Sequence, residues 1–140
     1  MTTATKKSAI KIVKESNRLN FIPKHLGIFG VQHFENLVYA ITEKNDKNYN
    51  GGYWEFAEVG DGFFMYPSEE RMYSAHSDYS ICDTLDNIAF GMLVSFLALD
   101  QMMWELHRRG KDTDKIINQW HALKNMLLDY DSEQLYPIID

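Results

Sequence analysis

The sequence predicts an α+β domain. A small antiparallel sheet of about three strands, built on a hairpin over residues 52–66, packs against a buried central helix and two or more amphipathic helices. Two observations predict this fold. The stretch 50–67, NGGYWEFAEVGDGFFMYP, places aromatic and β-branched residues on both sides of a Gly-Asp-Gly turn. The stretch 84–109 is apolar all round its central turns, which is typical of a helix surrounded by other elements.

The hairpin has two limbs of different character. The first limb, 52–59, mixes aromatic and acidic residues, so neither of its faces is cleanly polar. The second limb, 63–66, is apolar throughout, as expected of a strand that is covered on both faces or paired centrally. The turn at 60–62 tolerates positive φ and predicts a short loop with a bulge. Pro67 ends the ladder because it has no N–H to donate.

We expect the chain to form two units. Residues 1–20 form a basic N-terminal arm that is partly disordered or helical, with a weak helix over 9–18, and residues 21–140 form the single domain. Pro23 interrupts any helix because it favours extended geometry in the residue before it. A helix over 31–45 is predicted from one apolar stripe at positions i, i+3, i+4 and i+7, made by Phe34, Leu37, Val38 and Ile41.

After the hairpin the sequence predicts three more elements and a docked tail. Residues 71–77 alternate imperfectly, which suits a third strand at the edge of the sheet. The central helix over 84–109 follows capping residues and stops at Gly110. A helix over 113–130 carries apolar residues at alternating spacings of four and three. The tail 133–140 is too apolar for a free end, so we expect it to dock.

Length and composition favour a soluble cytoplasmic protein. A chain of 140 residues is long enough to bury its own core. The single cysteine, Cys82, has no intrachain partner, which points to a reducing compartment. Lys6 and Lys7 are not followed by the apolar run of a secretory signal. The longest uncharged apolar segment, 87–99, is much shorter than the ~20 residues of a membrane span.

Charge is distributed unevenly along the chain. The net charge is −6, yet residues 1–24 hold six basic side chains and one acidic one, whereas the remaining 116 residues hold eight basic and nineteen acidic ones. A basic arm on an acidic body could bind nucleic acid or an acidic partner. The other interpretation is a solvated and partly helical segment, which such arms more commonly are. The acidic residues are spread thinly, so phosphate-like spacing and DNA mimicry are disfavoured.

The motifs of common catalytic and metal sites are absent from the sequence. It contains no HExxH, no Gly-x-Ser-x-Gly and no cysteine pair, and its five histidines are scattered over different predicted elements. Cys82 stands beside Asp83, whose negative charge disfavours the thiolate of a nucleophile. Glu55 and Glu58 differ in parity, so on a regular strand they face opposite sides and form no dyad. We therefore predict no catalytic residue, no cofactor and no metal site.

The hairpin carries a family resemblance. NGGYWEF at 50–56 and GFFMYP at 62–67 resemble the GGYWEF and GGFYMAP signature of the ArdB/KlcA antirestriction proteins. The resemblance covers about residues 21–140. Further matches are FIP at 21–23 with Gly27, LVY at 37–39, Gly91 with FLAL at 96–99, and the final Ile139-Asp140. The chain departs from the family at 60–62, where Asn-Gly-Gly is common, and at Tyr66, where a small residue is usual.

The resemblance implies a single α+β domain carried by mobile elements such as plasmids and pathogenicity islands. It implies protection of incoming DNA from type I restriction-modification enzymes, and it brings no catalytic residue with it. We expect a non-enzymatic protein that contacts the type I restriction-modification complex or a host factor linked to it. The candidate contact residues are Tyr53, Glu55, Asp61 and Asp140. We expect no membrane partner and no strong nucleic-acid binding, and the sequence leaves the oligomeric state open between a monomer and a weak dimer.

The alternative function is a nucleic-acid-binding accessory protein of a mobile element that acts through the basic arm. On this hypothesis, removal of residues 1–19 abolishes DNA binding, and affinity falls steeply with salt.

Overall fold

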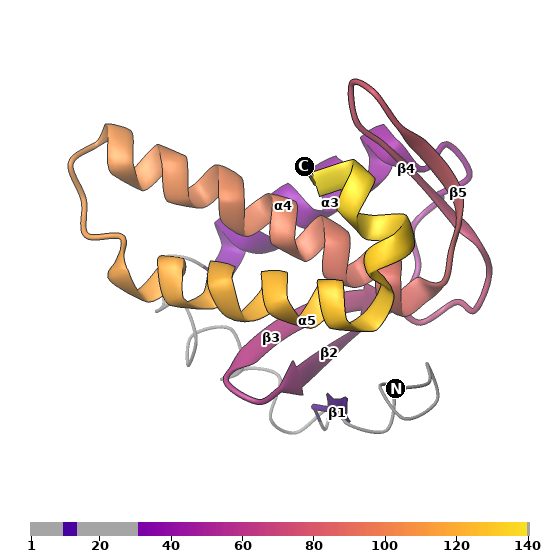
Figure 1. Cartoon of the computed structure of the whole chain (residues 1–140), viewed down its shortest axis with the longest axis horizontal. Coiled ribbons are helices and arrows are strands. Elements are labelled where there is room, and N and C mark those ends of the chain that lie inside the picture. Colours follow the sequence, from indigo (N-terminus) through magenta and orange to yellow (C-terminus); the bar gives the residue numbers. More distant parts are fainter. Residues whose placement is uncertain (1–9, 14–30, 140) are drawn as a thin grey trace.

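The structure is a computed structural model that describes residues 10–13 and 31–139. Figure 1 shows helices α4 and α5 side by side over the β2–β3 hairpin, with a second hairpin, β4–β5, projecting at one end. The elements in chain order are β1 (Lys11–Ile12), α3 (Val31–Asn45), β2 (Trp54–Val59), β3 (Gly62–Pro67), β4 (Tyr73–His76), β5 (Ile81–Leu85), α4 (Asn87–Arg108) and α5 (Asp114–Ile139). The predicted helix over 31–45 is confirmed at both ends.

The β2–β3 hairpin has a regular register. Its pairs run from Trp54 opposite Pro67 to Val59 opposite Gly62, without a shift. The predicted bulge is therefore wrong: the strands are joined by a two-residue turn, and Gly60 takes a positive φ of 57° at its first position, as in a type II′ turn. Such a turn matches the twist of the strands, so no extra residue is needed.

Helix α4 closes the open edge of β3. The Ser95 hydroxyl accepts the Met65 N–H and donates to the Met65 carbonyl, both at 3.1 Å. Gly91 lies directly on the strand, because a Cβ there would be 2.1 Å from the Cβ of Tyr66. Every residue of β3 is buried. The predicted central helix is confirmed, and α4 and α5 cover the apolar second limb of the hairpin.

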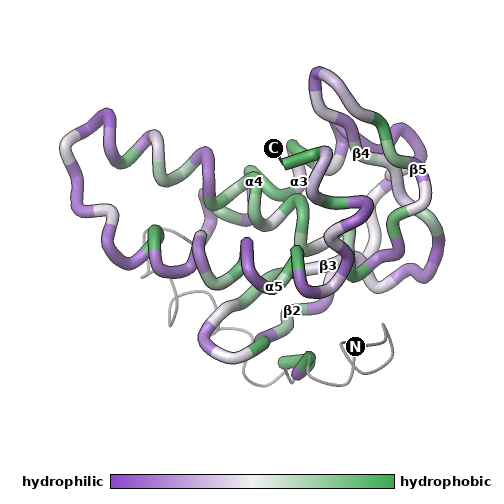
Figure 2. The backbone as a smooth tube through the Cα atoms, viewed as in Figure 1, coloured by the Kyte–Doolittle hydropathy of each residue, from purple (hydrophilic) through white to green (hydrophobic). Residues whose placement is uncertain are grey.

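The hydrophobic core is centred where α4 packs on β3. Figure 2 shows the hydrophobic stretches along α4 where it crosses β3, whereas the ends joined by the α4–α5 loop are hydrophilic. Helix α4 ends at Arg108, and Gly110 follows with φ of 66° and donates its N–H to the His107 carbonyl, so the predicted stop at Gly110 is confirmed. The ring of Tyr73 stacks on Phe90 at 4.9 Å, which joins β4 to α4.

The third strand of the main sheet differs from the prediction. The third strand is β1, because the strand order of this sheet is β1-β2-β3 and Lys11 stands opposite Glu58. The predicted helix over 9–18 is therefore wrong at 11–12. The Val13 N–H also donates to the Phe56 carbonyl at 2.8 Å. A free strand edge offers hydrogen bonds that override a weak helical preference. The remainder of the arm, residues 1–9 and 14–20, lies outside the described residues.

The predicted edge strand over 71–77 belongs to another sheet. Its core, β4, pairs with β5, a strand that was not predicted. The helix predicted from Thr84 begins at Asn87, because β5 continues to Leu85 and Asp86 supplies the N-cap. The β4–β5 pairing contains an irregularity between Tyr73 and Ala75, which explains the imperfect alternation in the sequence.

Helix α5 continues beyond the predicted 113–130 into the tail. Asp131 interrupts it with non-helical angles (φ −157°, ψ 71°) and starts a new turn by accepting the Gln134 N–H. The Gln134 amide also donates to the Asp131 carboxylate at 2.6 Å. Leu135 and Ile138 are buried, so the predicted docking of the tail is confirmed.

Candidate partner-contact surface

The predicted contact residues Tyr53 and Asp61 lie at opposite ends of the β2–β3 hairpin. Tyr53 precedes β2 and is 51% exposed, whereas Asp61 lies in the turn and is exposed. A strand rises about 3.3 Å per residue, so these side chains start roughly 20 Å apart. The Asp61 carbonyl accepts the Gln119 amide at 3.1 Å, which fixes the turn against α5. Asp140 lies outside the described residues. The structure therefore does not bring Tyr53 and Asp61 together into one patch.

Glu55 lines a groove of about 700 Å³ between the hairpin, the loop after β3 and the start of α4. It stands on β2 opposite Tyr66. Exposed apolar side chains of Ile12 and Met72 lie on the walls, and polar groups come from Glu70, Arg71 and Asp86. An open groove with both carboxylates and apolar surface suits the side chains of another polypeptide.

Asp86 is held in place from two sides. One carboxylate oxygen accepts the Ala89 N–H at 2.7 Å and caps α4, and the other accepts the Tyr130 hydroxyl at 2.8 Å. Burial, and then the hydrogen bond to Asp86, raise the pKa of Tyr130 well above its usual value. Tyr130 therefore remains a neutral donor, and Asp86 has a rigid position at the groove.

The Arg71 side chain contacts other residues of the fold. Its guanidinium donates to the Asp46 carboxylate and to the Met72 carbonyl, each at 2.9 Å, and lies 3.9 Å from the centre of the Tyr73 ring. The Asp46 side chain is only 1% exposed, so this pair neutralises a buried carboxylate at the end of α3. The remaining charge of the groove is acidic.

Sequence reasoning did not select Arg71 or Asp86 as site residues. A signal for Arg71 was present, because it is the one basic residue between 69 and 86. Asp86 lies in the first turn of the predicted central helix, and its place in the same groove as Glu55 depends on how α4 packs on the hairpin.

Glu55 and Glu58 were predicted to face opposite sides of the strand. Glu55 lines the groove, and Glu58 lies opposite Lys11 of β1.

Within residues 10–13 and 31–139, no three His, Cys, Asp or Glu side chains stand close enough to hold a metal ion. The Cys82 thiol donates to the Gln134 side-chain oxygen at 3.1 Å.

The comparisons with known proteins identify the family. Residues 47–140 match the family model described as antirestriction protein.

The chain belongs to the antirestriction protein family.

Two curated antirestriction proteins illustrate the similarity. An Escherichia coli protein named antirestriction protein KlcA is 28% identical over the full length of both chains. A protein of E. coli strain K12 named putative antirestriction protein YubI is 30% identical over 70% of each chain.

The fold also matches a solved antirestriction structure. With a TM-score of 0.81 and 27% identity, the chain resembles a structure from work on KlcA and ArdB over 94% of both chains. That work describes a novel fold and antirestriction activity against type I DNA restriction systems in vivo but not in vitro. The predicted ArdB/KlcA resemblance and the α+β class are confirmed.

Helix α4 has the length and apolarity of a membrane span, the one such helix in the described part of the chain. However, 61% of its most apolar stretch is buried, and the helix packs against β3, α3 and α5. In this chain the helix therefore forms part of the core.

Proposed function

We propose that this antirestriction protein acts in the cytoplasm and relieves type I restriction of incoming DNA, without catalysing a reaction. The observation that carries this proposal is the match, over almost the whole chain, to the fold of KlcA and ArdB, proteins described as active against type I systems in vivo. The same description reports no activity in vitro. An activity that needs the cell is accounted for by a partner that the cell supplies.

The contact is made with protein and not by imitating DNA. The partner is the type I restriction-modification complex or a host factor linked to it. Support comes from the groove beside Glu55, where carboxylates alternate with exposed apolar side chains such as Met72. A DNA mimic instead needs rows of carboxylates at phosphate spacing.

The proposed contact residues are Tyr53, Glu55, Asp61 and Asp140. Glu55 and Tyr53 are close in sequence and form one contact region at the groove end of the hairpin. Asp61 makes a separate contact at the turn, where its side chain is exposed.

The test is the plating efficiency of unmodified phage on a type I restricting host. Expression of the wild-type chain should raise plating at least tenfold, and a host without the restriction genes should show no change. Unchanged restriction at normal expression would sink the proposal. Full protection by a Glu55→Ala protein would sink the assignment of the groove, and Asp114→Asn, an exposed substitution at the start of α5, serves as the control.

A further inference from the structure

The β4–β5 hairpin presents two unusually exposed apolar side chains. Tyr79, in the turn after β4, is 94% exposed and Ile81, the first residue of β5, is 83% exposed. They are the two most exposed large hydrophobic residues in the described part of the chain. Figure 1 shows this hairpin projecting beyond the helices. Large apolar side chains grouped on one exposed element mark a candidate surface for a protein contact.

The turn that carries Tyr79 is held by hydrogen bonds. The Ser77 N–H donates to the Ser80 carbonyl at 2.8 Å, and the Ser77 hydroxyl accepts the N–H groups of Ser80 at 3.2 Å and Tyr79 at 3.4 Å. The turn is therefore formed before binding, and docking loses little conformational entropy.

The two strands of the hairpin are anchored to three helices. The His76 N–H donates to the Asn45 side chain of α3 at 3.0 Å, and the Cys82 thiol donates to Gln134 of α5. Tyr73 stacks on Phe90 of α4. These contacts hold both strands of the hairpin against the helices, while Tyr79 and Ile81 stay exposed.

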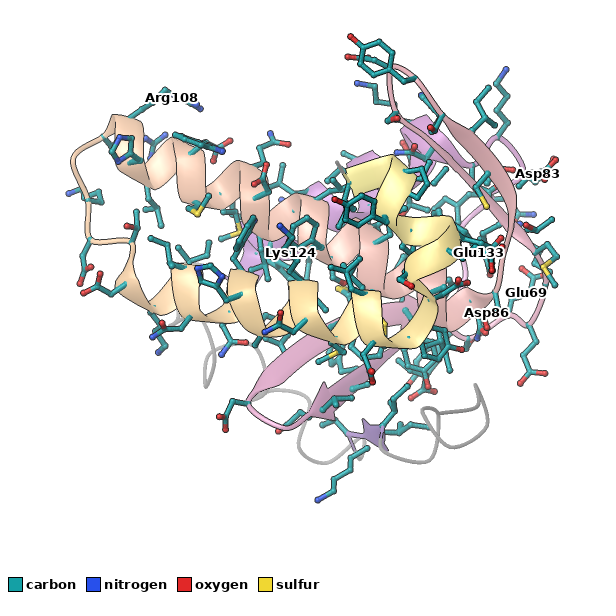
Figure 3. All side chains as sticks on the ribbon, viewed as in Figure 1. Glu69, Asp83, Asp86, Arg108, Lys124 and Glu133 are labelled. Atoms are coloured by element: carbon teal, nitrogen blue, oxygen red, sulfur yellow. The ribbon has the colours of Figure 1, made fainter. Side chains whose placement is uncertain are left out.

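The segments on one side of the hairpin are acidic, whereas Lys44 and Arg108 line a groove with Asp78 on the other side. Residues 69–86 hold five carboxylates and one basic side chain, Arg71, a net charge of −4 with His76 neutral. Residues 125–139 at the end of α5 hold three carboxylates and no basic side chain. Figure 3 shows Glu69, Asp83, Asp86 and Glu133 at the end of the molecule that carries the hairpin.

We propose that the β4–β5 hairpin docks into an apolar pocket on a partner protein whose rim carries lysine or arginine side chains. Tyr79 and Ile81 fill the pocket, and Asp78 and Asp83 pair with the rim. A second copy of this chain brings like charges to the same place, and nucleic acid brings phosphates, so both are disfavoured. The inference rests on the proposed function in one respect, that the partner contact relieves restriction.

Three variants test the hairpin in the phage assay. Tyr79→Ser with Ile81→Ser removes the apolar anchor, and Asp78→Lys with Asp83→Lys reverses the charge. The control, Asp114→Lys, changes an exposed acid at the start of α5, which lies at the opposite end of the molecule from the β4–β5 hairpin in Figure 1. Since the four hairpin positions are exposed, all the proteins should keep the wild-type unfolding midpoint. Each hairpin variant should lose relief at least tenfold, and the control should keep it.

The outcomes separate the two proposals. Full relief by the folded serine variant overturns the hairpin contact. Loss by the serine variant together with full relief by the lysine variant overturns the basic rim. If the wild-type chain gives no relief, the proposed function fails and cross-linking in cells decides the hairpin contact.

For that arm, a photoreactive benzoylphenylalanine replaces Tyr79 and keeps an aromatic ring in the turn. A cross-link to one site flanked by lysine or arginine, lost when Asp78 and Asp83 are both lysine, supports the proposal. No site-specific cross-link, or a cross-link to a second copy of this chain, overturns it.

Discussion

Replacing Gly91 with alanine should destabilise the protein, although local preferences predict the opposite. In a helix interior alanine is favoured over glycine by about 1 kcal/mol. At Gly91, however, the added Cβ would lie 2.1 Å from the Cβ and 2.5 Å from the Cα of Tyr66, and 2.7 Å from the Met65 carbonyl oxygen. Carbon atoms normally approach to about 3.5–4.0 Å, so α4 must move by about 1.5 Å.

The size of the effect follows from two costs. Forcing an extra methyl group into a packed interior costs about 1–3 kcal/mol. The shift also breaks or lengthens the two hydrogen bonds between Ser95 and Met65, each contributing about 1 kcal/mol. After the gain in helix propensity, we expect the free energy of unfolding to fall by about 2–4 kcal/mol.

Urea unfolding followed by circular dichroism measures this difference. The matched control is Gly62→Ala, whose Cβ would meet the Met126 methyl carbon at 2.9 Å and the Ala122 Cβ at 3.1 Å. The methionine end is flexible and can move, so the control should lose no more than about 1 kcal/mol. If Gly91→Ala equals or exceeds the wild type in stability, the close contact between α4 and β3 is refuted.

Two further predictions concern buried polar pairs. Arg71→Ala leaves the buried Asp46 carboxylate without its ion pair and should cost about 3 kcal/mol in urea unfolding, with the exposed Lys115→Ala as control; a loss below about 1 kcal/mol would contradict it. The raised pKa of Tyr130 means that the unfolded chain loses this proton first. The contribution of Tyr130 to the free energy of unfolding is therefore full below about pH 10 and is lost as the pH rises further. Tyr130→Phe should flatten that loss and cost about 1 kcal/mol at pH 7. An equally steep loss above about pH 10 in the phenylalanine variant would rule this out.

Much of the candidate site could not be predicted from the sequence, because it depends on contacts between distant residues. Tyr53 and Asp61 are close in sequence, but a strand holds its two ends far apart. Asp86 and Glu55 line one groove because α4 packs on the hairpin through Gly91. The exposure of Tyr79 and Ile81 depends on a second sheet whose strand β5 carries no clear periodic signal.

The sequence by itself determined the elements whose signals are local: the β2–β3 hairpin with its glycine turn, the helix over 31–45, and the stop of α4 at Gly110. Turn geometry, side-chain period and capping act over a few residues, so the amino acids there are sufficient. Only the tertiary structure decided that β1 completes the main sheet, that β4 pairs with β5, and that α4 seals the edge of β3. Strand edges pair with whichever partner the packed core brings close, and that partner can come from any part of the chain.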